Sequence, residues 1–269
     1  MASRVLRRGR AGRSAAILSA APAAGAAPAG APAITLSIVS HRQARLANQL
    51  LEDLGRRCAT PLALVLTQNA ADPDRFAIER LRAPVEVIVN AAAKGFGANH
   101  NAAFARCRTP YFCVANPDIR LGADPFPALL DALAAARAGV AGPLVRAPDG
   151  HIEDSARRFP TPAILAGKLV RDRREPDYPT DRGTIGVDWV AGMFMLFRSE
   201  AFARVGGFDE RYFLYYEDAD ICRRLRRAER PAVFAPEAEV IHDARRASRR
   251  NPRLALHHAA SAWRFLWGP

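Results

Sequence analysis

Apolar residues in the first half of the chain alternate between short runs and helical spacing. Residues 34–39 form a short apolar run of the kind found in buried strands. Apolar residues then recur at the spacing of a helix face, with polar residues between them: Leu46, Leu50, Leu51, Leu54 and Cys58. The same pattern predicts further strands at residues 62–67, 85–89 and 111–115 and further helices at residues 97–107 and 125–137. This order predicts an α/β fold, with a doubly wound, mostly parallel mixed sheet flanked by helices in a single domain.

The second half of the chain has a less regular pattern. Residues 151–186 hold several prolines and many charges, and we interpret them as a long excursion over the surface. An apolar strand is expected at residues 189–197, a helix at 217–228, one or two short strands at 231–241 and a final helix at 253–267.

Residues 1–33 differ in composition from the rest of the chain. An Arg-rich start gives way to an Ala/Pro/Gly tract with too few large apolar groups to form a core. We expect a disordered leader here. A signal peptide is the alternative, but the apolar stretch is short and prolines follow it at once. The folded domain is therefore expected at residues 34–269.

Charge and cysteine content narrow the classes of partner. The formal net charge is +12, almost all of it from arginine, which implies an affinity for phosphates, nucleic acid or an acidic membrane surface. The cysteines form no C-x-x-C pair, which favours reduced thiols in a cytoplasmic protein over a zinc site or disulfides. No apolar stretch approaches the roughly 18 residues of a membrane span.

Asn116-Pro117-Asp118 directly follows the expected strand at residues 111–115. A carboxylate at the carboxyl end of a central strand is well placed for Mg²⁺ or Mn²⁺, which prefer oxygen ligands and commonly share them with phosphates. Ordinary turn formation is the alternative explanation of this tripeptide. The acidic cluster described next favours the metal site.

Residues 206–220 combine acidic and aromatic side chains just before and within an expected helix. Helix capping explains one or two of the acids but not the aromatic run at residues 212–216. Aromatic rings cover the apolar faces of sugars, and a carboxylate beside them accepts hydroxyl hydrogen bonds or acts as a general base. The cluster therefore predicts a sugar site.

Two further features bear on anion binding. Residues 94–101 form a Gly-containing loop that opens a helix, which suits contact with a nucleotide or phosphate but lacks the third glycine of the dinucleotide fingerprint. His242 precedes a basic run, Arg245, Arg246, Arg249 and Arg250, and then the aromatic end of the last helix. These features fit docking on an acidic bilayer. The spacing of Trp263, Leu266 and Trp267 instead favours packing of that helix on the domain.

Taken in order, the motifs resemble family 2 glycosyltransferases of the rhamnosyltransferase-like type. They are N-P-D, W-V-A-G-M-F-M-L-F-R, G-G-F-D-E-R-Y-F-L-Y-Y-E-D-A-D-I-C-R-R-L and V-I-H, and the resemblance covers roughly residues 34–267. It implies a GT-A fold, a nucleoside-diphosphate-sugar donor, a divalent metal and inversion at the anomeric carbon. Residues 34–150 would then be the nucleotide-binding half, and residues 151–269 the acceptor-binding and catalytic half.

The resemblance also assigns roles to individual residues. Asp218 would be the general base, paired with Glu217, and Asp118 and His242 would contact the metal. Acceptor contacts would come from Trp189, Gly192, Met193 and Tyr216. Donor contacts would come from Ser40, Asn69, Lys94, Gly95, Phe96, Asn99, Asn101, Asn116 and Arg246.

The expected reaction is transfer of a sugar, with rhamnose suggested by the resemblance, to a hydroxyl of a glycan or lipid-linked acceptor of the cell envelope. Peripheral contact with an acidic membrane at its inner face is a further expectation. One alternative is a nucleotidyltransferase-like enzyme, but residues 40–43 lack the glycines that such an enzyme needs after its first strand. The other is a basic nucleic-acid-binding protein. We expect no nucleic-acid partner, because the acid-aromatic cluster would repel phosphates.

Overall fold

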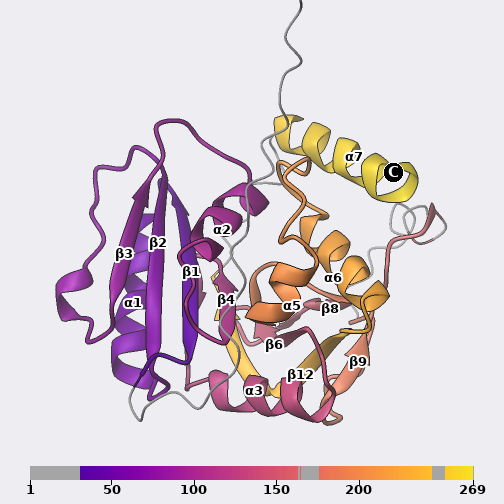
Figure 1. The fold of residues 1–269 in the computed structure, drawn as a ribbon, viewed down its shortest axis with the longest axis horizontal. Helices are drawn as coiled ribbons and strands as arrows, with labels where there is room; N and C mark the ends of the chain where they lie inside the picture. The colour runs from indigo at the N-terminus through magenta and orange to yellow at the C-terminus, as the bar shows by residue number, and fades with distance from the viewer. Residues whose placement is uncertain (1–30, 163, 165–175, 244–251, 269) are drawn as a thin grey trace, which may run out of the picture.

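The computed structural model describes residues 31–162, 164, 176–243 and 252–268 (Figure 1). Residues 1–30, the predicted leader, lie outside them, as do Arg245, Arg246, Arg249 and Arg250. The centre of the fold is a ten-stranded sheet in the order β3-β2-β1-β4-β11-β6-β12-β5, with β7 beside β6 and β9 beside β12. Strands β8 and β10 form a separate pair.

The strands are β1 Ile34–His41, β2 Leu62–Ala70, β3 Val85–Val89, β4 Tyr111–Ala115, β5 Ile119–Arg120, β6 Val140–Arg146, β7 Ile152–Glu153, β8 Ala156–Arg157, β9 Ile185–Val187, β10 Trp189–Val190, β11 Phe194–Arg198 and β12 Ala232–His242. The helices are α1 Ala44–Arg57, α2 Phe96–Phe104, α3 Phe126–Ala135, α5 Ser199–Arg204, α6 Glu217–Arg227 and α7 Pro252–Trp267, with a 3₁₀ turn, η1, at Ile78–Arg80.

The sheet is mixed but mostly parallel through its first half, as predicted. Strand β1 runs parallel to both β2 and β4, and β2 runs parallel to β3. Strand β11 is inserted antiparallel between β4 and β6, and β6 then pairs parallel with β12. The carboxyl ends of β1 to β4 therefore meet at the same edge, where open α/β sheets bind their ligands.

Alternating side chains divide the core into two layers, one on each face of the sheet. Phe112 and Val114 of β4 point to one face, and Cys113 and Ala115 point to the other. Helices α1 and α3 cover the second face through an apolar cluster that includes Leu50. Helices α2, α5 and α6 cover the first face (Figure 1). One sheet joins both layers, which confirms the predicted single α/β domain.

The expected strand at residues 189–197 is wrong as a single element. Residues 189–190 pair with β8, whereas residues 194–198 pair with β4 and β6 in the main sheet. The chain changes sheets between them, at Gly192, whose N–H donates to a side chain of α6. A continuous apolar run does not reveal such a change of partner, because both parts are buried.

Other elements also differ from the expectation. Residues 151–186 are not only a surface excursion, because they contain β7, β8 and part of β9. The short strands expected at residues 231–241 form one strand, β12, with an irregularity between Ala235 and Glu239. Strand β6 was not predicted, although it lies between β11 and β12.

Helix α7 lies across one end of the molecule, beside the start of α6 (Figure 1). Ser261 and Phe265 face the domain and are buried, whereas Trp263 and Trp267 are 65% and 57% exposed. The expectation that these two tryptophans pack on the domain is wrong, because the helix is rotated to bury the opposite side. None of the helices in the described ranges is both long and apolar enough to span a membrane.

Candidate active site

A cavity of about 480 Å³ opens at the carboxyl ends of β1, β2 and β4. Its walls also include the loop before α2, the loop before α6 and one residue of α7. Several predicted donor and metal residues line it: Asn69, Lys94, Phe96, Asn99, Asn116 and Asp118. They are distant in sequence, so the topology of the sheet brings them together.

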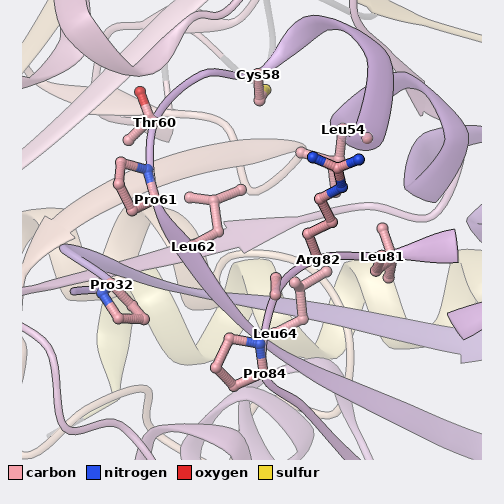
Figure 2. A pocket seen from close by; sticks show the side chains of 12 residues that line it. Pro32, Leu54, Cys58, Thr60, Pro61, Leu62, Leu64, Leu81, Arg82 and Pro84 are labelled. Carbon is pink, nitrogen blue, oxygen red and sulfur yellow. The ribbon is translucent and has the colours of Figure 1, made fainter. Parts of the chain in front are cut away.

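Figure 2 shows another cavity, of about 390 Å³, among Pro32, Pro61 and Pro84. These prolines precede β1, β2 and β3, so this cavity lies at the amino ends of the parallel strands. Its lining includes apolar side chains such as Leu62 and Leu81. This cavity therefore lies at the edge of the sheet opposite to the predicted donor and metal residues.

Three asparagines fix the backbone of the loop before α2. Asn69 accepts a hydrogen bond from the Lys94 N–H at 2.8 Å and donates to the Lys94 carbonyl at 2.9 Å. Asn90 donates to the side-chain oxygens of Asn69 and Asn99, at 2.9 and 2.7 Å. Asn99 donates in turn to the carbonyls of Lys94 and Gly95. The network holds the loop in place, with the Lys94 cation at the cavity.

The loop before α6 is conformationally strained and held from two sides. Tyr215 and Tyr216 adopt left-handed backbone angles, with φ of 72° and 68°. Such conformations cost energy in residues other than glycine and persist where packing enforces them. The N–H of Phe96 on α2 donates to the Phe213 carbonyl at 3.0 Å, and Ser261 on α7 donates to a carbonyl of the same loop at 2.9 Å. The aromatic run is thereby fixed between α2 and α7.

Asp118, His242 and Glu153 form a row beside the first cavity. Antiparallel pairing of β12 with β5 places His242 opposite Ile119, next to Asp118. His242 Nε2 lies 3.4 Å from Asp118 Oδ1, and His242 Nδ1 lies 2.7 Å from Glu153 Oε2. Within the described chain, buried Asp118 Oδ1 makes no hydrogen bond. A carboxylate oxygen and an imidazole nitrogen that face each other in this way fit a divalent cation between them.

This row also sets the charge of His242. Burial lowers the pKa of the imidazole, but its contacts with Asp118 and Glu153 outweigh burial and raise the pKa to about 9. Without a metal, His242 is therefore protonated at neutral pH and bridges the two carboxylates. The described residues contain no cluster of three or more His, Cys, Asp or Glu side chains that could bind a metal ion. Phosphate and water oxygens would complete the shell, as is usual for Mg²⁺.

Asp218 occupies the first turn of α6, where two backbone N–H groups fix its carboxylate. Gly192 donates to Oδ2 at 2.8 Å and Ala219 donates to Oδ1 at 2.8 Å. Gly192 is the point at which the chain crosses from β10 to β11, so the break in that strand serves to orient the carboxylate. Each carboxylate oxygen retains a lone pair that can accept another hydrogen bond.

The environments of Glu217 and Asp218 separate their pKa values. Burial raises the pKa of Asp218, while the Gly192 and Ala219 N–H groups and the Arg157 charge oppose that rise. Burial and the Asp218 charge raise the pKa of Glu217 well above its usual value, and its Oε2 has no hydrogen-bond partner in the described chain. These directions favour proton retention at Glu217 over Asp218, which makes Asp218 the better candidate for a base.

A smaller cavity, of about 170 Å³, lies next to Asp218. The predicted acceptor residues Trp189 and Tyr216 line it, together with Arg157, Arg158 and His258. Tyr215 lines both this cavity and the larger one, so the two adjoin at the strained loop. The Asp218 carboxylate lines the smaller cavity, on one side of the Tyr215 side chain that both cavities share.

The remaining predicted site residues lie elsewhere. Ser40 accepts a hydrogen bond from the Gln43 N–H, and Asn101 bonds the backbone of Phe208; neither lines a cavity described here. Gly95 adjoins Phe213, and Gly192 adjoins Asp218. Met193 accepts the Asn116 N–H through its carbonyl and packs within the core. Arg246 is outside the described residues.

Sequence analysis missed Glu153, Arg157, Arg158 and His258. The first three lie in residues 151–186, which were predicted to be a surface excursion. Strands of only two residues are too short to show the alternation of apolar and polar residues that predicts a strand. The pair of acids at residues 153–154, followed closely by the pair of arginines at 157–158, is the signal that could have identified them. His258 lies on α7 and reaches the cavity only through tertiary packing.

Comparison with known sequences identifies the family. The model of the family "Glycosyltransferase like family 2" matches residues 32–258. The N-acetylglucosaminyl-diphospho-decaprenol L-rhamnosyltransferase of Mycobacterium tuberculosis is 33% identical over 240 residues, which cover 79% of this chain and 77% of that protein. Rhamnosyltransferase WbbL of Escherichia coli is 30% identical over 190 residues, or 66% of this chain and 72% of that protein.

Solved structures support the same fold. GalNAc-T7, crystallised with UDP, GalNAc and Mn²⁺, superposes with a TM-score of 0.59 at 14% identity, over 81% of this chain and 45% of that one. The mannosyltransferase of Pyrobaculum calidifontis with GDP-Man and Mn²⁺ gives a TM-score of 0.55 at 16% identity, over 89% and 66%. Neither the nucleotidyltransferase alternative nor the nucleic-acid-binding alternative gains support from these relatives. The chain has the GT-A fold and belongs to glycosyltransferase family 2, with rhamnosyltransferases among its relatives.

Proposed function

We propose that this glycosyltransferase moves rhamnose from a nucleoside diphosphate to a hydroxyl of a lipid-diphosphate-linked N-acetylglucosamine, with inversion at the anomeric carbon. The observation that carries the proposal is the Asp218 carboxylate, which the Gly192 and Ala219 N–H groups hold at the acceptor cavity. The sugar and the acceptor follow from the rhamnosyltransferases that the chain resembles.

Inversion requires a single displacement. Asp218 takes the proton of the acceptor hydroxyl as its oxygen forms a bond to the anomeric carbon. The bond from that carbon to the donor phosphate breaks on the opposite side, and its electron pair leaves with the nucleoside diphosphate. Trp189 and Tyr216 would hold the acceptor sugar ring beside Asp218. Neutral Glu217 would add no second negative charge near the attacking oxygen.

The donor would occupy the larger cavity. Its diphosphate would meet the Lys94 cation, on the loop fixed by the asparagine network. Asp118 and His242 would hold a divalent cation, Mg²⁺ or Mn²⁺, and the buried Asp118 oxygen that faces His242 at 3.4 Å without a hydrogen bond supports this assignment. Such a cation supplies positive charge to the departing diphosphate. UDP or GDP with Mn²⁺ in the structural neighbours supports a nucleotide donor and a metal.

The exposed face of α7 would contact the membrane that carries the acceptor. Leu256, Trp263 and Trp267 are 71%, 65% and 57% exposed and recur at the spacing of one helix face. The same helix contributes His258 to the acceptor cavity. Exposed tryptophans favour the interface between water and lipid. The net charge of +12 favours an anionic leaflet, and the four free cysteines fit the reducing cytoplasmic side.

The direct test compares wild type with Asp218→Asn. Transfer from nucleoside-diphosphate-rhamnose donors (UDP, dTDP and GDP) to a lipid-diphosphate-linked N-acetylglucosamine is followed by mass spectrometry. We expect Asp218→Asn to lose about 10²–10⁴-fold in turnover, because a general base is removed. Donor affinity in a thermal-shift titration with Mn²⁺ should be unchanged. Turnover of this variant within tenfold of wild type would exclude Asp218 as the base.

A further inference from the structure

The acceptor cavity contains cations that a neutral sugar does not need. Besides Asp218, Glu217 and its aromatic side chains, the cavity is lined by Arg157 and Arg158. They are adjacent residues at the end of β8, a strand that pairs with β10 next to the crossing point at Gly192.

Arg157 is held in position over an aromatic ring. Antiparallel pairing places it opposite Trp189, and its guanidinium lies 5.1 Å from the centre of that ring. Its Nε donates to the Asp154 carbonyl at 2.7 Å and lies 3.1 Å from Asp154 Oδ2. These contacts fix the guanidinium through Nε and, in the described chain, involve neither Nη group. The charge is close enough to Asp218 to oppose the rise of its pKa.

Arg158 is exposed, and its guanidinium lies 5.1 Å from the centre of the Tyr178 ring. Its backbone is fixed on both sides, because its N–H donates to Asp177 and its carbonyl accepts the Trp189 Nε1–H at 2.9 Å. In the described part of the chain, no carboxylate lies within ion-pair distance of its guanidinium. A stacked, preorganised guanidinium without a counter-ion is suited to a planar oxyanion.

We propose that Arg157 and Arg158 bind the phosphate groups that link the acceptor sugar to its carrier, and so select a phosphate-linked acceptor over a neutral glycoside. The inference rests on the proposed function and deepens it. Trp189, Tyr216 and Asp218 would contact the acceptor sugar itself. The two arginines would then contact the anionic group attached to that sugar. Arginine forks bind phosphate oxygens in pairs, which gives orientation as well as affinity.

The test uses two water-soluble acceptors that differ only in charge. One carries N-acetylglucosamine on a diphosphate with a short prenyl chain, and the other is the octyl glycoside of the same sugar. We expect wild type to prefer the diphosphate acceptor in kcat/KM. Arg158→Ala should reduce kcat/KM for that acceptor about 10–100-fold, the size of charge-assisted hydrogen bonds, and change it less than threefold for the octyl glycoside. Arg157→Lys should show the same pattern, because lysine keeps the charge but loses the fork.

The matched control is Arg227→Ala, which removes an exposed cation from the far end of α6. It should leave both acceptors unchanged. Equal losses on both acceptors in Arg158→Ala would overturn the proposal, as would losses that appear only when anionic vesicles are added, which would assign the arginines to lipid headgroups. Failure of wild type to use either acceptor with any donor would instead refute the proposed function itself.

Discussion

Glu217 and Asp218 show how neighbouring residues of one chemical type acquire different roles. Both are acids in the first turn of α6; Glu217 is buried, and Asp218 is half-buried at the smaller cavity. Only Asp218 receives two backbone N–H groups and the field of Arg157. Burial raises the pKa of both acids, but less at Asp218 than at Glu217, so position in the fold makes Asp218 the better candidate for the base.

Glu217→Gln should therefore keep most of the activity. The substitution replaces a carboxyl whose raised pKa favours the neutral form, so we expect turnover within tenfold of wild type. The pKa of Asp218 is raised by burial, so turnover should fall as the pH decreases through that raised value, and the position of this acid limb should not move in the variant. The measurement is a pH–rate profile of both proteins. A loss above 100-fold, or a displaced limb, would make Glu217 part of the proton transfer.

His242 predicts a pH dependence of stability in the metal-free protein. Its folded-state pKa of about 9 is above the ordinary value of 6.5, so the protonated form stabilises the fold. That contribution, about 3 kcal/mol by linkage, is complete below pH 6.5 and is lost as the pH rises through 9. Urea unfolding at pH 6 and pH 9.5 should show this loss in wild type and not in His242→Gln. The same loss in both proteins would show that other groups cause it.

The loop before α2 packs closely against the loop before α6, and this contact leaves no room for a side chain at Gly95. A Cβ on Gly95 would lie 2.6 Å from the Phe213 carbonyl oxygen. Gly95→Ala should push the strained loop away from α2, lowering the free energy of unfolding by about 1–3 kcal/mol and weakening donor affinity. Thermal unfolding and donor titration measure both effects.

Gly55→Ala is the control for the Gly95 variant. Gly55 is inside α1, and a Cβ there would meet nothing within 4 Å. The control should be as stable as wild type or more so, because alanine favours the helix. If Gly95→Ala matches Gly55→Ala in stability and donor affinity, the close contact at Gly95 contributes neither to stability nor to donor binding.

Elements of about five residues or more with a clear apolar pattern could be predicted from the sequence. Strands of two residues, and the point at which the chain passes from one sheet to another, could not. Strands β3 and β4 match the expected bounds, because each is an apolar run between turns. Strands β7 and β8, each of two residues, carry Glu153 and Arg157 into the site, but their pairing depends on tertiary contacts. The roles of Asp118 and Asp218 were inferred from motif order. The contributions of their neighbours Glu153 and Arg157 could not be inferred, because contacts between residues distant in sequence produce no local sequence pattern.

At the scale of the whole molecule, the acceptor cavity, its arginines and the exposed face of α7 lie at the same end of the fold. We expect liposome sedimentation that grows with anionic lipid and weakens with salt. Replacing Trp263 and Trp267 with serine should reduce that binding at least fivefold and leave the melting temperature unchanged, because both rings are exposed. Val89→Ser, at another exposed apolar position, is the control. Equal binding by the double variant would exclude α7 as the docking face.

The central claim, a single displacement with Asp218 as the base, has one direct measurement. The product formed from a nucleoside-diphosphate-rhamnose and a lipid-diphosphate-linked N-acetylglucosamine is isolated, and NMR determines its anomeric configuration relative to that of the donor. The structure places the Asp218 carboxylate, held by two backbone N–H groups, at the acceptor cavity as a base, so the account predicts the inverted configuration. A retained configuration would exclude a single displacement from the side opposite the leaving group and would contradict it.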